Sequence, residues 1–284
     1  MSDTIKPNIK RLKRKREPSK KSNIKKQSFS NRVADALKKG DLVDFYQIVP
    51  KDDANKNARS YETYPKVRID LPFQAIIDGA TGSGKTNFIM NLLSAIKEFK
   101  HIFLFAKVLN EPLYKYLINK YEKLGEKHGK QLIHYSDDIT DLPDIKEIQE
   151  TLGDDNGVLI VDDFVNEPPE NLKTVCDAYA AGRKLGGNDK GGLSVIFLTQ
   201  DYFKSPKFVR GQSRLIGIGR LTSMKDLKRI ASEYSLEKSP EELVEIHNRI
   251  QKSGERNFLL IDLTKTQPHE IQYKYRKNLA PLTK

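Results

Sequence analysis

Residues 79–86 read GATGSGKT, and this segment constrains the fold of the chain more than any other. It matches the pattern G-x-x-x-x-G-K-[ST], in which glycines let the backbone wrap a phosphate chain with its N–H groups facing inward. The apolar residues 74–78 precede the segment, and the helix-compatible residues 87–96 follow it. A strand, a glycine-rich loop and a helix in this order form a phosphate site. The sequence therefore predicts a nucleotide-binding loop.

Two side chains of this loop have predicted chemical roles. Lys85 is expected to bring positive charge to the β- and γ-phosphates, and Thr86 to offer its hydroxyl to Mg²⁺. The predicted nucleotide contacts are Gly79, Ala80, Thr81, Gly82, Ser83, Gly84, Lys85 and Thr86. ATP and Mg²⁺ are the predicted cofactors.

Apolar runs suited to strands alternate with helix-compatible stretches along the rest of the chain. The predicted strands span residues 73–78, 101–106, 131–135, 158–162, 193–199 and 214–219. The predicted helices span residues 85–99, 111–124, 171–184 and 239–253. This alternation predicts an α/β fold with a mainly parallel sheet and helices on both faces. Two later runs, 257–263 and 271–275, predict a terminal hairpin.

Two predicted strands lie between the phosphate loop and the acidic strand 158–162. This spacing suits the ASCE-type, RecA-like division of P-loop NTPases, in which another strand intervenes between the two motif strands. Motor ATPases belong to that division. Small-molecule kinases generally place the two strands side by side, so the spacing favours a motor over a kinase.

Charge and composition divide the chain into four predicted parts. Residues 1–30 are a basic arm predicted to be disordered, and residues 31–64 a short helix followed by a connector. Residues 65–265 form the predicted ATPase domain, and residues 266–284 a strand with a basic tail. The net charge of +12 and the pI near 9.4 favour a polyanionic partner, with nucleic acid the first candidate. The arm, which contains the run KRKR, is interpreted as a DNA-binding arm, a nuclear import signal or a solvating tail.

The scarcity of cysteines, of closely spaced histidines and of long apolar runs disfavours disulfide-bonded, metal-binding and membrane-spanning proteins. Cys176 is the single cysteine, so no internal disulfide is expected, and the five histidines lack metal-ligand spacing. No run approaches the ~18 apolar residues of a membrane span, and the first residues lack a secretory signal. An intracellular protein that is not bound to a membrane is therefore expected.

Two carboxylates end the strand 158–162, where a nucleotide-hydrolysing site needs them. Asp162 is predicted to hold the magnesium shell, and Asp163 to act on the attacking water as general base. The next strand, 193–199, is followed by Gln200, the position of a γ-phosphate sensor. Two arginines are candidates for a finger contributed by a neighbouring subunit, Arg183 first and Arg210 second.

Four segments together resemble the FtsK/HerA-like ATPases, and among them the poxvirus-type genome-packaging ATPases of large DNA viruses and virophages. They are GATGSGKT, VLIVDDF, GRKLG leading into SVIFLTQDYF, and SPKFVR, over roughly residues 70–220. The resemblance implies a ring of five or six subunits that hydrolyses ATP and drives double-stranded DNA into a preformed capsid. It further implies an infected host cell as the location, either a virus factory or the nucleus, or association with the virion. Asp163 departs from the glutamate that is common in the wider superfamily.

Other functions remain open at this stage. A DNA pump for plasmid transfer or chromosome segregation, a helicase, and a nucleotide-gated DNA-binding or scaffold protein with little turnover all fit the phosphate loop. Lys184, Lys190 and Lys204 are candidates for DNA contact because they lie close to the predicted active-site strands. The capsid protein that would receive the ring is not specified by the sequence.

Overall fold

The computed structural model of the protein describes residues 62–64, 67–186, 191–234, 237–254 and 256–282. The predicted basic arm, the short helix predicted within residues 31–64 and Lys190 lie outside these described residues. None of the helices in the described part of the chain has the length and apolar character needed to cross a lipid bilayer.

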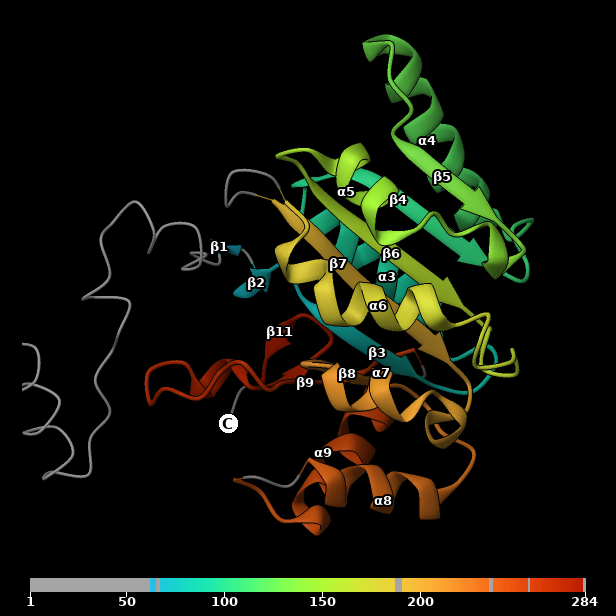
Figure 1. Ribbon diagram of the computed structural model, residues 1–284. Coiled ribbons are helices and arrows are strands. Elements are labelled where there is room, and N and C mark those ends of the chain that lie inside the picture. The colour runs from blue at the N-terminus through green and yellow to red at the C-terminus, as the bar shows by residue number, and fades with distance from the viewer. Residues whose placement is uncertain (1–61, 65–66, 187–190, 235–236, 255, 283–284) are drawn as a thin grey trace, which may run out of the picture. The chain divides into compact units, whose positions relative to one another are not determined.

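The described residues contain a nine-stranded central sheet (Figure 1). Its strands are β3 (Gln74–Asp78), β4 (Phe99–Ala106), β5 (Ile133–Ser136), β6 (Asn156–Asp162), β7 (Gly192–Thr199), β8 (Leu215–Ile218), β9 (Leu259–Asp262), β10 (Tyr275–Lys277) and β11 (Ala280–Pro281). They are ordered β11-β10-β9-β8-β3-β7-β6-β4-β5. The pairs from β8 to β5 are parallel, whereas β9, β10 and β11 pair antiparallel. A separate antiparallel pair joins β1 (Glu62–Tyr64) to β2 (Ile69–Leu71).

Each of the six strands predicted within residues 73–219 is present, so the predicted α/β fold is confirmed. Strand β7 lies between β3, which leads into the phosphate loop, and β6, which carries the acidic end. The prediction that another strand separates the two motif strands is therefore confirmed. Because these strands run parallel, their carboxyl ends meet at one edge of the sheet, where ligands of open α/β folds bind.

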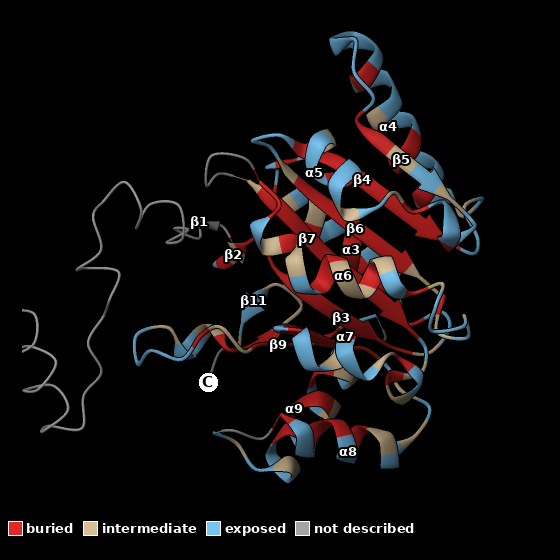
Figure 2. Cartoon of the chain, in the orientation of Figure 1, coloured by how far each residue is buried: buried red, intermediate tan, exposed pale blue. Residues whose placement is uncertain are grey.

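Helices cover both faces of the sheet. They are α3 (Lys85–Ala95), α4 (Pro112–His128), α5 (Ile145–Leu152), α6 (Lys173–Ala181), α7 (Lys207–Gln212), α8 (Met224–Glu233) and α9 (Pro240–Lys252). Alternate residues of β4 point to opposite faces: Ile102 and Leu104 pack with α3 and α4, whereas Phe103 and Phe105 pack with α5 and α6. Burial on both faces explains why the central strands read as continuous apolar runs (Figure 2).

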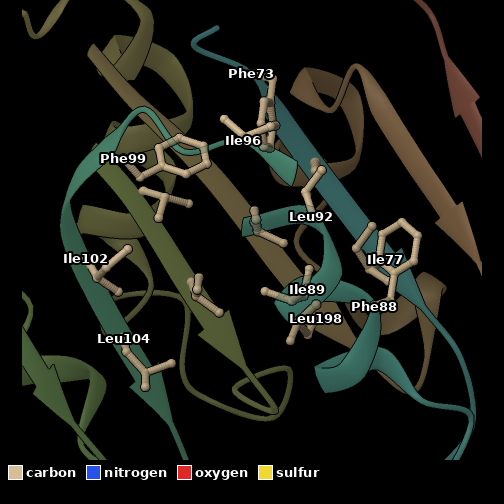
Figure 3. Packing of buried hydrophobic residues seen from close by; sticks show 14 of the residues in the cluster. Phe73, Ile77, Phe88, Ile89, Leu92, Ile96, Phe99, Ile102, Leu104 and Leu198 are labelled. Atoms are coloured by element: carbon tan, nitrogen blue, oxygen red, sulfur yellow. The ribbon is translucent and has the colours of Figure 1, made fainter. Parts of the chain in front are cut away.

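The helix that follows the phosphate loop is fixed by its apolar face. Phe88, Ile89 and Leu92 of α3 are each at most 5% exposed and pack against Ile77 and Leu198 of the sheet (Figure 3). Burying such side chains contributes about 1.5–3 kcal/mol each. The N-terminus of α3 is thereby held at the carboxyl edge of β3.

Several predicted boundaries are wrong. The helix predicted over 85–99 ends at Ala95, because Phe99 already belongs to β4. The helix predicted over 171–184 ends at Ala181 and continues as a 3-10 turn. The helix predicted over 111–124 continues to His128, where Gly129 ends it in the left-handed conformation with φ 62°.

The predicted terminal hairpin is partly wrong. Strand β9 falls within the predicted run 257–263 and pairs antiparallel with β10, but β9 also joins β8 and so extends the main sheet. The second run, 271–275, begins as the 3-10 turn Ile271–Tyr273, and β10 starts only at Tyr275. The predicted strand began at Ile271, but this side chain is 42% exposed. Backbone hydrogen bonds to the carbonyl oxygens of residues 267 and 270 close a turn there instead.

Candidate nucleotide-binding and catalytic site

The phosphate loop joins β3 to α3 and depends on its glycines. Gly82 has φ 74° and Gly84 has φ 92°, a backbone conformation that other residues rarely adopt. At Gly79, an added Cβ would lie 2.6 Å from the Ser83 hydroxyl oxygen. Gly82 and Gly84 are therefore required by the backbone conformation, and Gly79 by its close approach to Ser83, in addition to the expected approach of phosphates.

The Lys85 side chain folds back across the loop. Its Nζ donates a hydrogen bond to the Gly79 carbonyl oxygen at 2.7 Å, and the residue is 9% exposed. Burial lowers the pKa of Lys85, and the charge of Asp162 opposes that shift. Lys85 thus lies between the phosphate loop and the acidic end of β6, where its charge can reach a bound phosphate.

Asp162 ends β6 beside the first turn of α4. The Tyr114 hydroxyl donates to its Oδ2 at 2.7 Å, and Tyr114 is 1% exposed. Burial raises the pKa of Asp162 to about 6, while the Tyr114 hydrogen bond and the charge of Lys85 lower it. The carboxylate is therefore stabilised by two groups and retains Oδ1 for a cation.

A second contact ties the same helix to the phosphate loop. Thr86 Oγ1 donates to Glu111 Oε2 at 3.1 Å, and Glu111 immediately precedes α4. Thr86, Asp162 and Glu111 offer hydroxyl and carboxylate oxygens, the donors that Mg²⁺ prefers. Among the described residues, no group of three or more His, Cys, Asp or Glu side chains is arranged to hold a metal ion. One or two carboxylates plus nucleotide phosphates is the usual manner of Mg²⁺ binding, so the donor set fits this cation.

Gln200 bridges the acidic edge and the phosphate loop. Its Nε2 donates to Asp163 Oδ1 at 3.3 Å, and its Oε1 accepts from Thr81 Oγ1 at 2.7 Å. Asp163 has φ 65°, an unusual value for a residue other than glycine. The left-handed turn directly after β6 brings the Asp163 side chain to Gln200, at the end of β7.

These groups line one pocket of about 440 Å³. Of the residues predicted from the sequence, it is lined by Thr81, Gly82, Gly84, Lys85, Thr86, Asp162, Asp163 and Gln200. Such a volume falls in the range of ligand pockets, roughly 300–1,000 Å³. The structure therefore brings the predicted phosphate, metal, base and sensor residues together.

The two predicted arginines do not line this pocket. Arg183 is half-buried in the 3-10 turn Gly182–Lys184 that follows α6. Arg210 of α7 lies 3.6 Å from the Glu233 carboxylate and donates from Nε to the Ser205 carbonyl oxygen at 3.3 Å. A role for either arginine in the site of a neighbouring subunit stays a prediction.

Comparison with protein families decides the assignment. The model of the family described as poxvirus A32 protein matches residues 64–267. The chain belongs to the poxvirus A32 protein family. The resemblance to poxvirus-type ATPases, inferred from four sequence segments, is thereby confirmed.

Named relatives of this A32-family protein come from poxviruses. The DNA packaging protein OPG160 of Vaccinia virus (strain Copenhagen) is 26% identical over 199 residues, which cover 68% of this chain and 69% of that protein. The protein of the same name from Monkeypox virus is also 26% identical over 199 residues, covering 68% of this chain and 62% of the relative.

Solved structures with similar folds include the genome packaging NTPase B204 from Sulfolobus turreted icosahedral virus 2. Its complex with sulfate has a TM-score of 0.47 and 19% identity, covering 70% of this chain and 95% of that one. Its complex with AMP has a TM-score of 0.48 and 16% identity, covering 75% of this chain and 100% of that one.

Residues of the A32-family site that were not predicted from the sequence include Glu111, Tyr114, Lys107 and Arg256. Lys107 pairs with Glu167 at 2.5 Å, and its Nζ lies 4.5 Å from the centre of the Phe164 ring. Glu111 and Lys107 follow the carboxyl end of β4, a position that could have marked them. Arg256 lies 172 positions after Gly84, the loop residue that it approaches, and no sequence pattern signals this contact.

Asp78, the last residue of β3, gives a prediction about stability. It is 2% exposed, its Oδ1 has no hydrogen-bond partner, and burial raises its pKa from 3.8 to about 7. Because the unfolded chain releases this proton at lower pH than the folded chain, the carboxyl costs stability as the pH rises from about 4 to about 7. Asp78→Asn should therefore raise the free energy of unfolding at pH 8, by at most about 4 kcal/mol, and much less at pH 4.5.

Urea denaturation at the two pH values measures this difference. The matched control is Asp137→Asn, because Asp137 is exposed and lies outside the pocket. An equal effect of Asp78→Asn at both pH values would contradict the raised pKa.

Proposed function

We propose that this A32-family protein hydrolyses ATP in the pocket described above and uses the energy to move double-stranded DNA into a viral capsid. The observation that carries the proposal is the Thr81–Gln200–Asp163 bridge, which links the phosphate loop to the acidic edge within one pocket. The printed name of the poxvirus relatives, DNA packaging protein, supports the assignment to packaging.

Each residue has a role in the proposed reaction. The loop backbone and Lys85 bind the phosphates, while Thr86 and Asp162 would hold Mg²⁺, whose charge would offset that of the phosphoryl group. Asp163 accepts a proton from the attacking water. Gln200, which contacts both Asp163 and Thr81, orients the water against the γ-phosphate.

Assembly and partners follow from the same proposal. The protein acts as a ring of five or six copies in an infected cell, around double-stranded DNA and against a capsid protein. The net charge of +12 supports a polyanionic partner. Arg183, or failing that Arg210, completes the site of the adjacent subunit. Lys184 and Lys204, both exposed, contact DNA; Lys204 follows the carboxyl end of β7, whereas the turn that holds Lys184 packs at the start of β7.

The rate of ATP hydrolysis with and without double-stranded DNA tests this function. We expect DNA to raise the rate by about tenfold or more in the presence of Mg²⁺, since a motor couples turnover to its track. The mass of the assembled species, measured in parallel, should be a multiple of the 32.5 kDa chain. A hydrolysis rate that DNA does not change at several salt concentrations would overturn the proposal of a DNA motor. Absence of hydrolysis would favour a nucleotide-gated DNA-binding protein instead.

Tyr114 gives a prediction specific to the metal. Tyr114→Phe keeps the buried ring but removes the hydrogen bond to Asp162, so the carboxylate is less well oriented. Loss of such a supporting contact costs about 10–100-fold in metal affinity, and we expect the Mg²⁺ concentration for half-maximal hydrolysis to rise by about tenfold. Tyr121→Phe is the matched control, since Tyr121 lies on the same helix and donates to the Phe99 carbonyl oxygen instead. Equal Mg²⁺ dependence of the two variants would remove Tyr114 from the metal site.

A further inference from the structure

A second pocket adjoins the phosphate pocket and has no role in the mechanism above. Its volume is about 750 Å³, and it shares Asn87 and Arg256 with the phosphate pocket. Arg256 marks the junction, because its Cβ lies 3.1 Å from where a Cβ on Gly84 would stand. The two pockets therefore meet at the N-terminus of α3.

Opposite walls of this second pocket come from distant parts of the chain. Asn87 and Asn91 of α3 form one wall, and the turn between β10 and β11 forms the other. Beneath them, Phe88 packs on Phe258 with ring centres 4.8 Å apart, and the two rings are 5% and 0% exposed. The floor is consequently apolar and fixed in the core.

The turn wall is held by a pair of asparagines. Asn278 has φ 53°, accepts from the Phe258 backbone N–H at 2.8 Å, and donates to Asn257 Oδ1 at 2.9 Å. These bonds fix the turn to the start of β9, so the wall does not depend on contacts to solvent. Leu279 and Pro281 add apolar surface to the same wall.

An apolar pocket edged by side-chain amides suits a planar heterocycle with hydrogen-bonding edges. We propose that this pocket holds the base and ribose of the nucleotide whose phosphates lie in the loop 79–86, with Arg256 beside the sugar–phosphate junction. The inference rests on the proposed ATP site and names its base-binding part. It assigns one wall of the base site to residues 277–282, which lie beyond the segment 64–267 that matches the family model, and the other wall to α3. The C-terminal region of this chain then takes part in recognition of the base.

A tryptophan reporter tests the location directly, because the chain contains no tryptophan. Asn91→Trp places the reporter in the pocket. Ser94→Trp is the matched control, since Ser94 lies on α3 outside the pocket and, like Asn91, donates to a carbonyl oxygen one turn earlier. ATP should reduce the emission of Asn91→Trp by about half, because a purine stacks on an aromatic side chain that it contacts. Inorganic tripolyphosphate, which has no base, should leave the emission unchanged, and the control should respond to neither ligand.

The outcomes separate this inference from the proposed function. Radiolabelled ATP in equilibrium dialysis reports binding independently of fluorescence. If ATP binds Asn91→Trp without changing its emission, or if tripolyphosphate changes the emission equally, the base lies elsewhere and the inference is overturned while the ATP site stands. If the wild-type protein binds no ATP, both the inference about the base and the proposed ATP site are overturned. Should Asn91→Trp fail to fold, Ala280→Trp gives the same readout from the opposite wall.

Discussion

Asp163→Asn is expected to reduce the kcat of ATP hydrolysis by about 100-fold or more while leaving the affinity for ATP within about threefold. The substitution keeps the size of the side chain and an oxygen that can accept from Gln200 Nε2, which lies 3.3 Å from Asp163 Oδ1. It removes the negative charge that would take a proton from water. Single-turnover hydrolysis and equilibrium binding of ATP measure the two effects separately.

Glu111 provides the competing carboxylate for this prediction. It lines the same pocket and accepts from Thr86 at 3.1 Å, so it could act on water in place of Asp163. Glu111→Gln should cost hydrolysis about tenfold if Glu111 only supports Thr86. A larger loss from Glu111→Gln than from Asp163→Asn would transfer the role of base to Glu111. The exposed Asp137, changed to Asn, controls for loss of a negative charge.

The fold was predictable where burial was two-sided. Strands such as β6 and β7 are covered on both faces, so their apolar runs are continuous and unambiguous. Helices α5, α7 and α8 were missed because they are short or depend on caps. Asp144 caps α5 through a capping box with Glu147, and Ser223 caps α8 by accepting from the Asp226 N–H. Such local hydrogen bonds start a helix without adding to the apolar periodicity from which helices were predicted.

The candidate site was predictable where its residues belong to short, continuous sequence motifs. The phosphate loop, Asp162 and Asp163 are each marked by a strand end, and parallel strands bring strand ends together. Glu111 and Tyr114 were not found, because their roles depend on α4 lying against β6 and the loop. Arg256 reaches Gly84 only through the antiparallel extension of the sheet. Contacts made across the sheet by later elements have no counterpart in local sequence.

Helix α4 connects the two halves of the predicted metal site. Glu111 accepts from Thr86 of the phosphate loop, and Tyr114, less than one turn further on, donates to Asp162 of β6. The Thr86 hydroxyl can bind Mg²⁺ through an oxygen lone pair while its proton stays hydrogen-bonded to Glu111. Both contacts of α4 are therefore compatible with an occupied metal site.

Lys85→Ala is expected to lower ATP affinity by about 100-fold and to bring hydrolysis below detection, because the charge that faces the phosphates is lost. Burial of Asp162 and Asp78 near Lys85 means that the substitution also leaves carboxyls without their cation, so thermal unfolding must accompany the binding measurement. Loss of ATP binding in a protein that is still folded is the expected result. Unchanged ATP affinity would contradict the assignment of the phosphate site.

Mixing this variant with Arg183→Ala tests whether sites are shared between subunits. A site with intact Lys85 and a neighbour with intact Arg183 forms at about a quarter of the interfaces in a randomly mixed ring, so about a quarter of wild-type activity should return. A mixture of Lys85→Ala with the double variant Lys85→Ala/Arg183→Ala should restore nothing, since no subunit then binds ATP. If rings form but the first mixture stays inactive, Arg183 does not act in trans. Mixing Lys85→Ala with Arg210→Ala then tests the second arginine in the same way. For Arg210 to act in a neighbouring site, it would have to leave Glu233, which lies 3.6 Å away.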